Sequence, residues 1–400
     1  MCIVALRSPV ETTMEALTSR PATAALKPGR GNCHRMGGRR CLVAPAVARA
    51  VQSMHFAKPM ADPEVVKDRA KAAVLGALLA DAATMPLHWH YDVGQIKRKV
   101  TGQPDGPLQA ALGLLLPDNM PLDLASLQAE FHSPSENMFY KYPVGQLSPY
   151  GAEAACLVRS LAAEGSLVPE RYAEQSVQEY RAYSGRLNSL SKRFLEQWDA
   201  GARWPTCGVA GDTQAHSLVR VPAIVARYAG SEQCRDAVAD AVRVHQAQQG
   251  PVDYAQALAT LLERCILGAP VADALKWGAF NKDPENVLYD EQRKEIADAL
   301  SDMDVDPRAI VKKYGISCAL PGPFIGPLAM IFGARGDFVT AVRANIMAGG
   351  DNCSRAAVVG ALCGANGGMA CLPESWRSKM ADWKALEAAA DKIVSDAKFV

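Results

Sequence analysis

The 400-residue chain has few aromatic residues, almost no net charge and no run of about 20 apolar residues. Phe, Trp and Tyr make up 6% of the sequence, and 43 basic side chains oppose 42 acidic ones. This balance excludes the strong positive field that draws a protein to nucleic acid or to an anionic membrane. Without a long apolar run, a membrane-spanning segment is not expected either. The composition therefore predicts a soluble globular protein with no nucleic-acid or membrane partner.

Disulfide and zinc patterns are also missing. The 11 cysteines are scattered, with no CxxC pair and no Cys/His cluster at zinc-finger spacing. Neither a disulfide framework nor a structural zinc site is predicted, and reduced thiols in a reducing compartment are the simpler interpretation. The hydrophobic content of 49% is enough to bury a large core.

The first 57 residues differ in composition from the rest. They are rich in Arg, Ser, Thr, Ala, Pro and Gly, and they lack a continuous apolar segment. This composition is typical of an organelle transit peptide rather than a secretory signal, with a disordered basic tail as the alternative. We place the end of this leader between Val47 and Asp62. We expect an organelle, a plastid rather than a mitochondrion, or the cytoplasm if the segment is not a leader.

Residues 62–400 are predicted to form one all-α domain. Asp62-Pro63-Glu64 combines an N-cap, a proline at the first helical position and an acidic first turn. Small residues at Ala72, Gly76 and Ala80 then form a flat seam along the first helix. Residues 94–144 are interrupted by Pro and Gly and are expected to be irregular. Further helices are expected at 152–163, 169–183, 187–198, 217–228, 232–246, 253–267, 271–277, 291–302, 307–314, 326–332, 337–348, 354–365 and 373–394.

The richest polar motif is Gly349-Gly350-Asp351-Asn352-Cys353-Ser354-Arg355, followed by a run of small residues. A Gly-Gly turn and an Asp that can cap a helix would direct backbone amides, a carboxylate, a thiol, a hydroxyl and a guanidinium into one small volume. The motif predicts a functional site at a helix start. An ordinary loop with a helix cap is the competing interpretation.

Four segments in this order resemble the ADP-ribosylglycohydrolase family. They are residues 76–88 (GALLADAATMPLH), 145–151 (GQLSPYG), 244–268 and 337–368, the last with the Gly349-Gly350-Asp351 turn. The resemblance implies a single orthogonal multi-helix bundle. It also implies hydrolysis of an N- or O-glycosidic bond to ADP-ribose or a related ribosyl group, with a small molecule or an ADP-ribosylated protein as substrate. Typical members of the family bind two magnesium ions through carboxylates of these motifs.

Most of those carboxylates are replaced here. Pro149 and Tyr150 occupy both aspartate positions of the second motif, Cys353 replaces the second aspartate of the last motif, and His88 stands where the first motif has glutamate. Magnesium prefers several oxygen ligands, so these changes argue against an intact two-magnesium centre and leave Asp351 as the candidate ligand. The same departures resemble the branch of J-type crystallins and selenoprotein J, in which Cys353 occupies the selenocysteine position.

If the protein is a hydrolase, His88 would act as general base, with Asp81 and Asp351 supplying negative charge. Cys353 is either a reactive thiol or a small buried residue, since the helix start and Arg355 favour its thiolate while Asp351 opposes it. A non-hydrolytic, crystallin-like protein and a thiol redox protein acting through Cys353 are the alternatives. The oligomeric state is not predicted. The residues expected to contact substrate are Asn352, Ser354, Arg355, Ser148, Tyr150 and Arg220.

Overall fold

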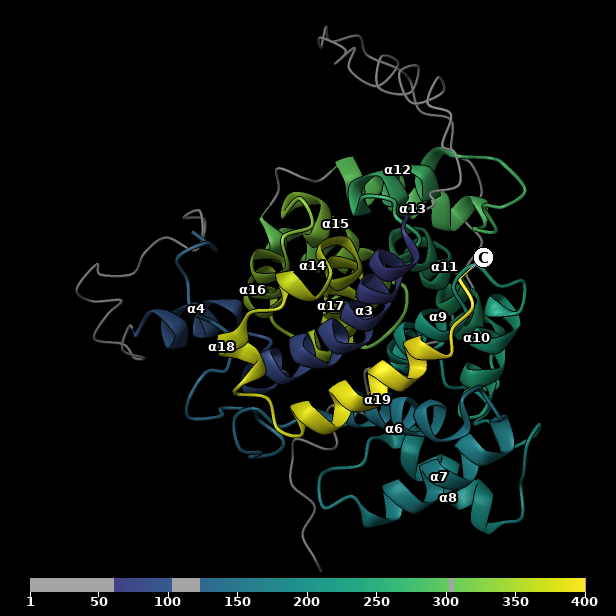
Figure 1. The fold of residues 1–400 in the computed structure, drawn as a ribbon. Coiled ribbons are helices and arrows are strands. Elements are labelled where there is room, and N and C mark those ends of the chain that lie inside the picture. Colours follow the sequence, from purple (N-terminus) through teal and green to yellow (C-terminus); the bar gives the residue numbers. More distant parts are fainter. Residues whose placement is uncertain (1–60, 103–122, 302–305, 400) are drawn as a thin grey trace, which may run out of the picture. The chain divides into compact units, whose positions relative to one another are not determined.

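The computed structural model describes residues 61–102, 123–301 and 306–399, and every regular element in these ranges is a helix (Figure 1). These residues belong to one unit, Ala48–Val400. The all-α prediction is confirmed. The expected leader, residues 1–57, lies outside the described residues and stays a prediction. The longer helices are α3 (Pro63–Thr84), α6 (Pro149–Glu164), α7 (Pro169–Ala182), α8 (Ser189–Asp199), α10 (Cys234–Arg243), α11 (Gln249–Ile266), α12 (Val271–Phe280), α13 (Asp290–Ser301), α15 (Gly322–Gly333), α16 (Phe338–Ala348), α17 (Asn352–Gly367) and α19 (Trp383–Ser395).

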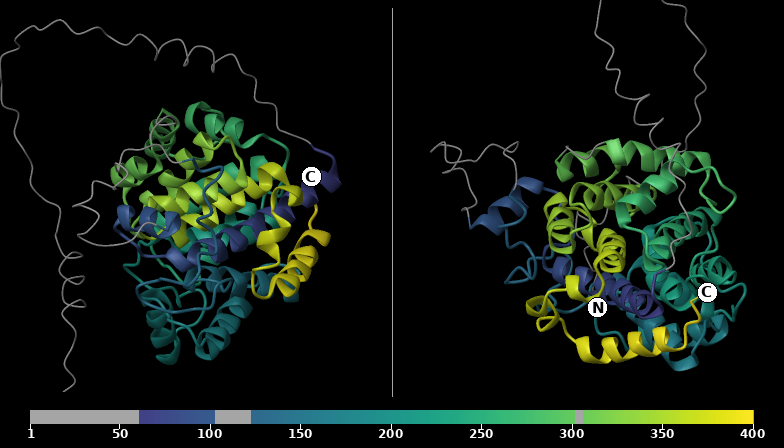
Figure 2. Two further views of the ribbon diagram at one scale, coloured as in Figure 1. Left: turned by 90° about the vertical axis from the view of Figure 1, so that its left-hand side faces the viewer. Right: turned by 45° about the horizontal axis from the view of Figure 1, so that its top comes forward.

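Helix α3 forms the centre of the fold. Its start follows the sequence signal, because the Asp62 side chain accepts a hydrogen bond from the Glu64 amide at 2.9 Å and Pro63 takes the first helical position. Figures 1 and 2 show α3 surrounded by other helices, and it contacts α17, α19, α6, α11, α16 and α9 (Val221–Tyr228). This central position brings the end of α3 next to the starts of α6 and α17.

The backbones of α3 and α17 lie against each other. A Cβ atom added to Gly76 would overlap the carbonyl of Gly360, and one added to Gly360 would overlap the carbonyl of Gly76. Gly364 approaches the carbonyl of Ala72 in the same way. The predicted small-residue seam on α3 is therefore half of a close helix–helix contact, and α17 supplies the other half.

One helical stretch contradicts the expectation that no segment is long and apolar enough to cross a bilayer. Residues Pro63–Leu87, which are α3 and the short 3₁₀ helix η1 (Met85–Leu87), have that length and composition. However, 94% of the apolar window is buried inside the protein. The apolar length is used here for the core, since every residue of α3 from Ala72 to Thr84 is buried.

Several boundaries differ from the predicted ones. Helix α4 (Val93–Thr101) lies in the stretch expected to be irregular, with the Asp92 side chain capping the Gln95 amide at 3.1 Å. The predicted helix at 373–394 is divided into α18 (Glu374–Arg377) and α19, with Asp382 in the left-handed conformation between them. The predicted helix at 217–228 begins as a 3₁₀ turn, η2 (Ala215–Arg220), before α9. The remaining short helix is α14 (Pro307–Tyr314), and η3 (Met369–Cys371) follows α17.

Candidate functional site

The Gly349-Gly350 turn is clamped between two loops. Both glycines have positive φ, 69° and 65°, and a Cβ at Gly350 would overlap Ile316. The Gly350 amide donates to the His90 carbonyl at 2.6 Å, and the Gly350 carbonyl accepts from the Trp89 amide at 2.9 Å. The Asp351 amide donates to the Ile316 carbonyl at 2.9 Å. The backbone thus fixes the start of α17 against the end of η1, so that Asp351 faces His88.

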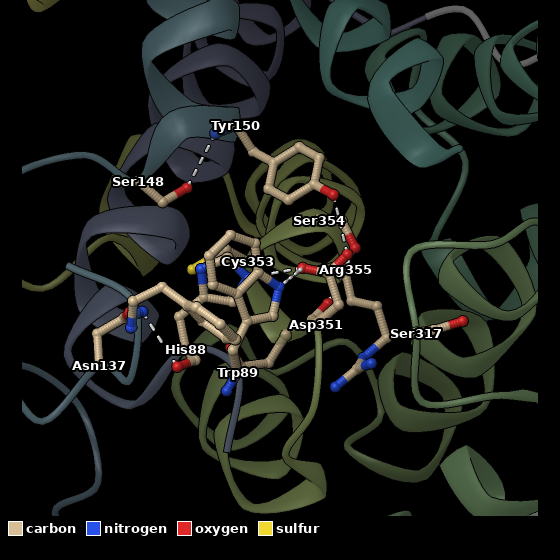
Figure 3. A network of polar contacts seen from close by, with 12 residues as sticks. His88, Trp89, Asn137, Ser148, Tyr150, Ser317, Asp351, Cys353, Ser354 and Arg355 are labelled. Atoms are coloured by element: carbon tan, nitrogen blue, oxygen red, sulfur yellow. Dashed lines mark hydrogen bonds and ion pairs between the residues drawn. The ribbon is translucent and has the colours of Figure 1, made fainter. Parts of the chain in front are cut away.

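The Asp351 carboxylate lies at the centre of a buried polar network (Figure 3). One of its oxygens, Oδ1, lies 2.6 Å from His88 Nε2 and accepts from the Trp89 indole N–H at 3.2 Å. The other oxygen, Oδ2, accepts from the Tyr150 hydroxyl at 2.9 Å. Asp351 is therefore not the side-chain cap that its position suggested, because its carboxylate points across to other elements and makes no capping hydrogen bond in α17.

His88 bridges Asp351 and Tyr140. Its Nδ1 lies 2.7 Å from the Tyr140 hydroxyl. Burial lowers the pKa of His88, so the ring is neutral near pH 7. Burial alone would raise the pKa of Asp351, but the hydrogen bonds from His88 and Tyr150 outweigh it, so that pKa is lowered and the carboxylate is charged. We assign the tautomer with the proton on Nε2, which donates to Asp351 while Nδ1 accepts from Tyr140.

Asp81 and Ser148 form a second buried pair beside the first. The Ser148 amide and hydroxyl donate to the two Asp81 oxygens at 2.7 and 2.5 Å. Ser148 is also the N-cap of α6, since its hydroxyl oxygen accepts from the Tyr150 amide at 3.1 Å and from the Gly151 amide at 3.3 Å. Burial raises the pKa of Asp81 to about 7, although the Ser148 hydrogen bonds oppose this. Although Asp81 lies in an apolar helix, where an unpaired carboxylate would be destabilising, both of its oxygens thus have a hydrogen-bond donor in Ser148.

Cys353 lies between these two pairs. Its side chain is fully buried, and its thiol lies 4.0 Å from the Asp81 carbonyl. Burial raises the pKa of Cys353 well above its usual range, and the carboxylates of Asp81 and Asp351 add to the effect. The helix start and the positive charge of Arg355 do not offset these effects. The protonated thiol is therefore a small, weakly polar group between the two carboxylates.

The other residues at the start of α17 are also buried. Arg355 donates from Nε to the Asn345 side-chain oxygen at 3.0 Å and from Nη2 to the Gly349 carbonyl, and burial lowers its pKa to about 10. Asn352 donates to the Leu87 carbonyl at 3.1 Å, and the Ser354 hydroxyl donates to the Asp351 carbonyl at 2.9 Å. These hydrogen bonds brace the turn. Only Arg355 Nη1 and Asn352 Oδ1 are without a partner.

Arg220 does not join this network, although the sequence placed it among the substrate contacts. It forms a buried ion pair with Glu153 at 3.1 Å, and His216 Nδ1 lies 3.1 Å from the same carboxylate. The Tyr150 ring lies 4.9 Å from the His216 ring, centroid to centroid. The Glu153 group is thus a neighbouring charged cluster that supports the far side of Tyr150.

The structure brings the other predicted residues together at the end of η1 and the starts of α6 and α17. Figure 3 shows His88, Ser148, Tyr150, Asp351 and Cys353 side by side, with Ser354 and Arg355 next to them. Asp81 joins them through Ser148, and Asn352 through the Leu87 carbonyl. Sequence reasoning missed Tyr140 and Glu153. The cluster Phe139-Tyr140-Lys141-Tyr142 within an irregular stretch was the available signal for Tyr140. Glu153 could have been found as the residue one turn after Tyr150 on α6.

The donor set does not fit a pair of magnesium ions. All four carboxylate oxygens of Asp81 and Asp351 are already engaged by N–H or O–H groups. Within the described ranges, no group of three or more His, Cys, Asp or Glu side chains is placed to hold a metal ion. Magnesium requires several free oxygen ligands in octahedral geometry, and this cluster offers donors instead.

A cavity of about 450 Å³ lies beside the network. Tyr142, Leu147 and Pro149 are among its lining residues, whereas His88, Asp351 and Cys353 are not. The Tyr142 ring stacks on Tyr140 with 4.1 Å between centroids. The network is thus separated from this cavity by side chains that pack on both.

Comparison with known proteins identifies the family. A family model described as ADP-ribosylglycohydrolase matches residues 62–398, so the chain belongs to the ADP-ribosylglycohydrolase family. Crystallin J1A of Tripedalia cystophora is 30% identical over 328 residues, which cover 78% of this chain and 92% of that protein. Crystallin J1B of the same organism is 27% identical over 331 residues, 79% of this chain and 93% of that protein. The predicted resemblance to the J-crystallin branch is confirmed.

A solved structure gives the same fold. An ADP-ribosylglycohydrolase-related protein complex matches with a TM-score of 0.56 and 21% identity, covering 84% of this chain and 100% of that chain. At this identity the match supports the all-helical architecture of the family.

Proposed function

We propose that this chain is a non-hydrolytic, metal-independent member of its family, a crystallin-like structural protein whose motif residues stabilise the fold. One observation carries the proposal: both ring nitrogens of His88 are engaged, one by the Asp351 carboxylate and the other by the Tyr140 hydroxyl. A general base needs a free nitrogen within reach of a water molecule. His88 has none in this arrangement, and its partners are buried with it.

The similarity to the crystallins of Tripedalia cystophora supports the same proposal. The chemistry of the network fits a structural role. The charged Asp351 carboxylate is neutralised by hydrogen bonds from His88, Trp89 and Tyr150, whereas several carboxylates at one site would need bound cations to offset their repulsion. The redox alternative has less support, since a buried thiol with a raised pKa is a poor nucleophile.

The test is hydrolysis of ADP-ribosylated protein and of small ADP-ribosyl compounds, with magnesium and with EDTA. We expect no turnover in either condition and no change in melting temperature when magnesium is added at constant ionic strength. Magnesium-dependent turnover, or saturable stabilisation by magnesium, would contradict the proposal. A catalytically competent family member assayed in parallel shows that the substrates are sound.

One observation favours a second candidate, a metal-independent ribosyl hydrolase that uses Asp81. Its pKa of about 7 is suited to general acid–base catalysis near neutral pH. Turnover in EDTA that is lost in Asp81→Asn, in a variant that retains its helical circular dichroism spectrum, would favour this candidate. Under the first proposal, wild type and variant are equally inactive.

A further inference from the structure

A second cavity is lined by none of the residues of the Asp351 network. It has a volume of about 550 Å³ and lies where the turn between α9 and α10 meets the last turns of α11. Ser231, Arg235, Arg264 and Trp277 are among its lining residues. The motifs at residues 76–88, 145–151 and 349–355 contribute none of the lining, whereas Thr260, Glu263, Arg264 and Leu267 come from the family segment at 244–268. The cavity is therefore separate from the Asp351 network, although it is built partly from a family segment.

Arg264 is the unusual residue of this cavity. It is 8% exposed, its guanidinium carbon lies 4.0 Å from the centroid of the Trp277 ring, and its Nε has no hydrogen-bond partner. Burial lowers the pKa of Arg264. Arg220 and Arg343 form ion pairs with Glu153 at 3.1 Å and Glu130 at 2.8 Å, whereas no carboxylate lies within ion-pair distance of Arg264 among the described residues. A buried guanidinium N–H without an acceptor is costly unless something binds to it.

Two further groups favour an anion in the same cavity. Helix α10 begins there, and its N-cap residue Gln233 makes no side-chain capping hydrogen bond. The Ser231 hydroxyl oxygen accepts from the Gln233 amide at 3.2 Å, which leaves the hydroxyl proton free to donate. Arg235 adds a second positive side chain from the first turn of α10.

The carboxylates that line the cavity are less able to oppose an anion. Glu263 is partly buried and accepts from the Gly230 amide at 2.7 Å. Glu232 and Glu285 are exposed, as is Arg235, so water and salt screen all three charges and the buried Arg264 is the dominant charge of the site. Arg264 lies near the C-terminal end of α11, where the helix dipole favours a cation, but this supplies no acceptor for its Nε.

We propose that this cavity binds a phosphate group, with the Arg264 guanidinium as the principal contact and the start of α10, Ser231 and Arg235 completing the site. The Trp277 ring packs on the Arg264 guanidinium and holds it in one orientation. Its N–H groups can therefore direct hydrogen bonds to a tetrahedral oxyanion. The proposal goes beyond the proposed structural function and does not depend on it.

Isothermal titration calorimetry on the full chain tests the proposal, with inorganic phosphate, pyrophosphate and citrate titrated separately at constant ionic strength. We expect saturable binding of phosphate or pyrophosphate to wild type. Arg264→Met keeps the side-chain contact with Trp277 but removes the charge, and it should weaken that binding about tenfold or more.

Arg203→Met is the matched control. The Arg203 guanidinium carbon also stacks on a tryptophan, lying 3.8 Å from the Trp198 ring centroid, but the guanidinium donates to the carbonyls of Trp198 and Ala202. This variant should bind phosphate as wild type does. The proposal is overturned if wild type shows no saturable binding, if only citrate binds, or if Arg264→Met and Arg203→Met bind phosphate equally. The wild-type titration decides the question even if Arg264→Met does not fold.

Discussion

Asp81 is the residue whose ionisation should be most visible in solution. Its pKa of about 7 lies above the ordinary value of 3.8, because burial disfavours the charged form. Between those two values the folded state binds more protons than the unfolded state, so this group makes the protein less stable as the pH rises. A shift of about three units corresponds to roughly 4 kcal/mol, since one unit is 1.36 kcal/mol.

We therefore expect Asp81→Asn to flatten the decrease in the free energy of unfolding between pH 4 and pH 7. Urea denaturation at several pH values measures this slope. Asp298→Asn, on the exposed face of α13, is the control and should leave the slope as in wild type. If the free energy of unfolding of the variant changed with pH in parallel with that of wild type, Asp81 would be charged throughout this range, stabilised by the hydrogen bonds from Ser148.

The Tyr150 hydroxyl gives a second prediction at this scale. It donates to Asp351 at 2.9 Å, and the side chain is 4% exposed. Tyr150→Phe leaves one oxygen of a buried carboxylate without a donor, so we expect it to lower the free energy of unfolding by about 1–3 kcal/mol. Tyr91→Phe, at a side chain that is 49% exposed, should change it by less than about 0.5 kcal/mol. Equal effects on unfolding would contradict the structural importance of the network.

The residues of the network were only partly accessible to sequence reasoning. The resemblance to the family motifs predicted that Asp81, Ser148, His88, Asp351 and Cys353 would meet in one site. The sequence could not indicate that Asp351 would turn away from its own helix. That choice depends on Tyr150 and Trp89, whose positions are set by tertiary packing rather than by local signals.

At the scale of elements, the contact between α3 and α17 is the most sensitive to side-chain size. Gly360→Ala places a methyl group against the Gly76 carbonyl, where there is no room unless the two helices separate. We expect a loss of about 1–3 kcal/mol or more in the free energy of unfolding, measured by chemical denaturation.

Gly250→Ala is the control for this substitution. Gly250 lies in the first turn of α11, and nothing apart from its chain neighbours lies within 4 Å of the Cβ position. Alanine has less conformational freedom to lose on folding, but Pro251 disfavours a helical residue before it, so the free energy of unfolding should change by less than about 0.5 kcal/mol. If Gly360→Ala were as stable as Gly250→Ala, the close approach of α3 and α17 would be wrong.

Element boundaries show where local signals end and packing takes over. The start of α3 was predictable because its cap, proline and acidic turn are all local. The division between α18 and α19 was not, since the residues of both are compatible with a helix, whereas the Ala381 amide bonds to the Gly145 carbonyl and Asp382 adopts a positive φ. Helix α15 contains Pro327 in its interior, so its full extent depends on burial of almost every residue rather than on propensity.

At the scale of the whole molecule, the free energy of unfolding should depend on pH in opposite directions through two buried carboxyl groups, those of Glu153 and Asp81. Burial alone would raise the pKa of Glu153, but His216, Arg220 and Asn188 outweigh it and lower that pKa to about 2, against an ordinary value of 4.5. The charged Glu153 therefore makes its full contribution to the free energy of unfolding above about pH 4.5, and this contribution is lost as the pH falls toward 2. Asp81 has the opposite slope between pH 4 and pH 7. Together these groups favour a maximum of stability between about pH 4 and pH 5.

Glu153→Gln separates the two slopes. At neutral pH it leaves Arg220 buried without a charged partner, so we expect a loss of about 3–5 kcal/mol in the free energy of unfolding. The free energy of unfolding lost as the pH falls below 4.5 should become smaller by about 3 kcal/mol. The loss as the pH rises from 4 to 7 should remain, because Asp81 is unchanged. Denaturation curves from pH 2.5 to pH 7.5 measure both. Glu291→Gln, at the exposed start of α13, should reproduce the wild-type curve, and an acid slope unaltered in Glu153→Gln would assign that slope to other carboxyl groups.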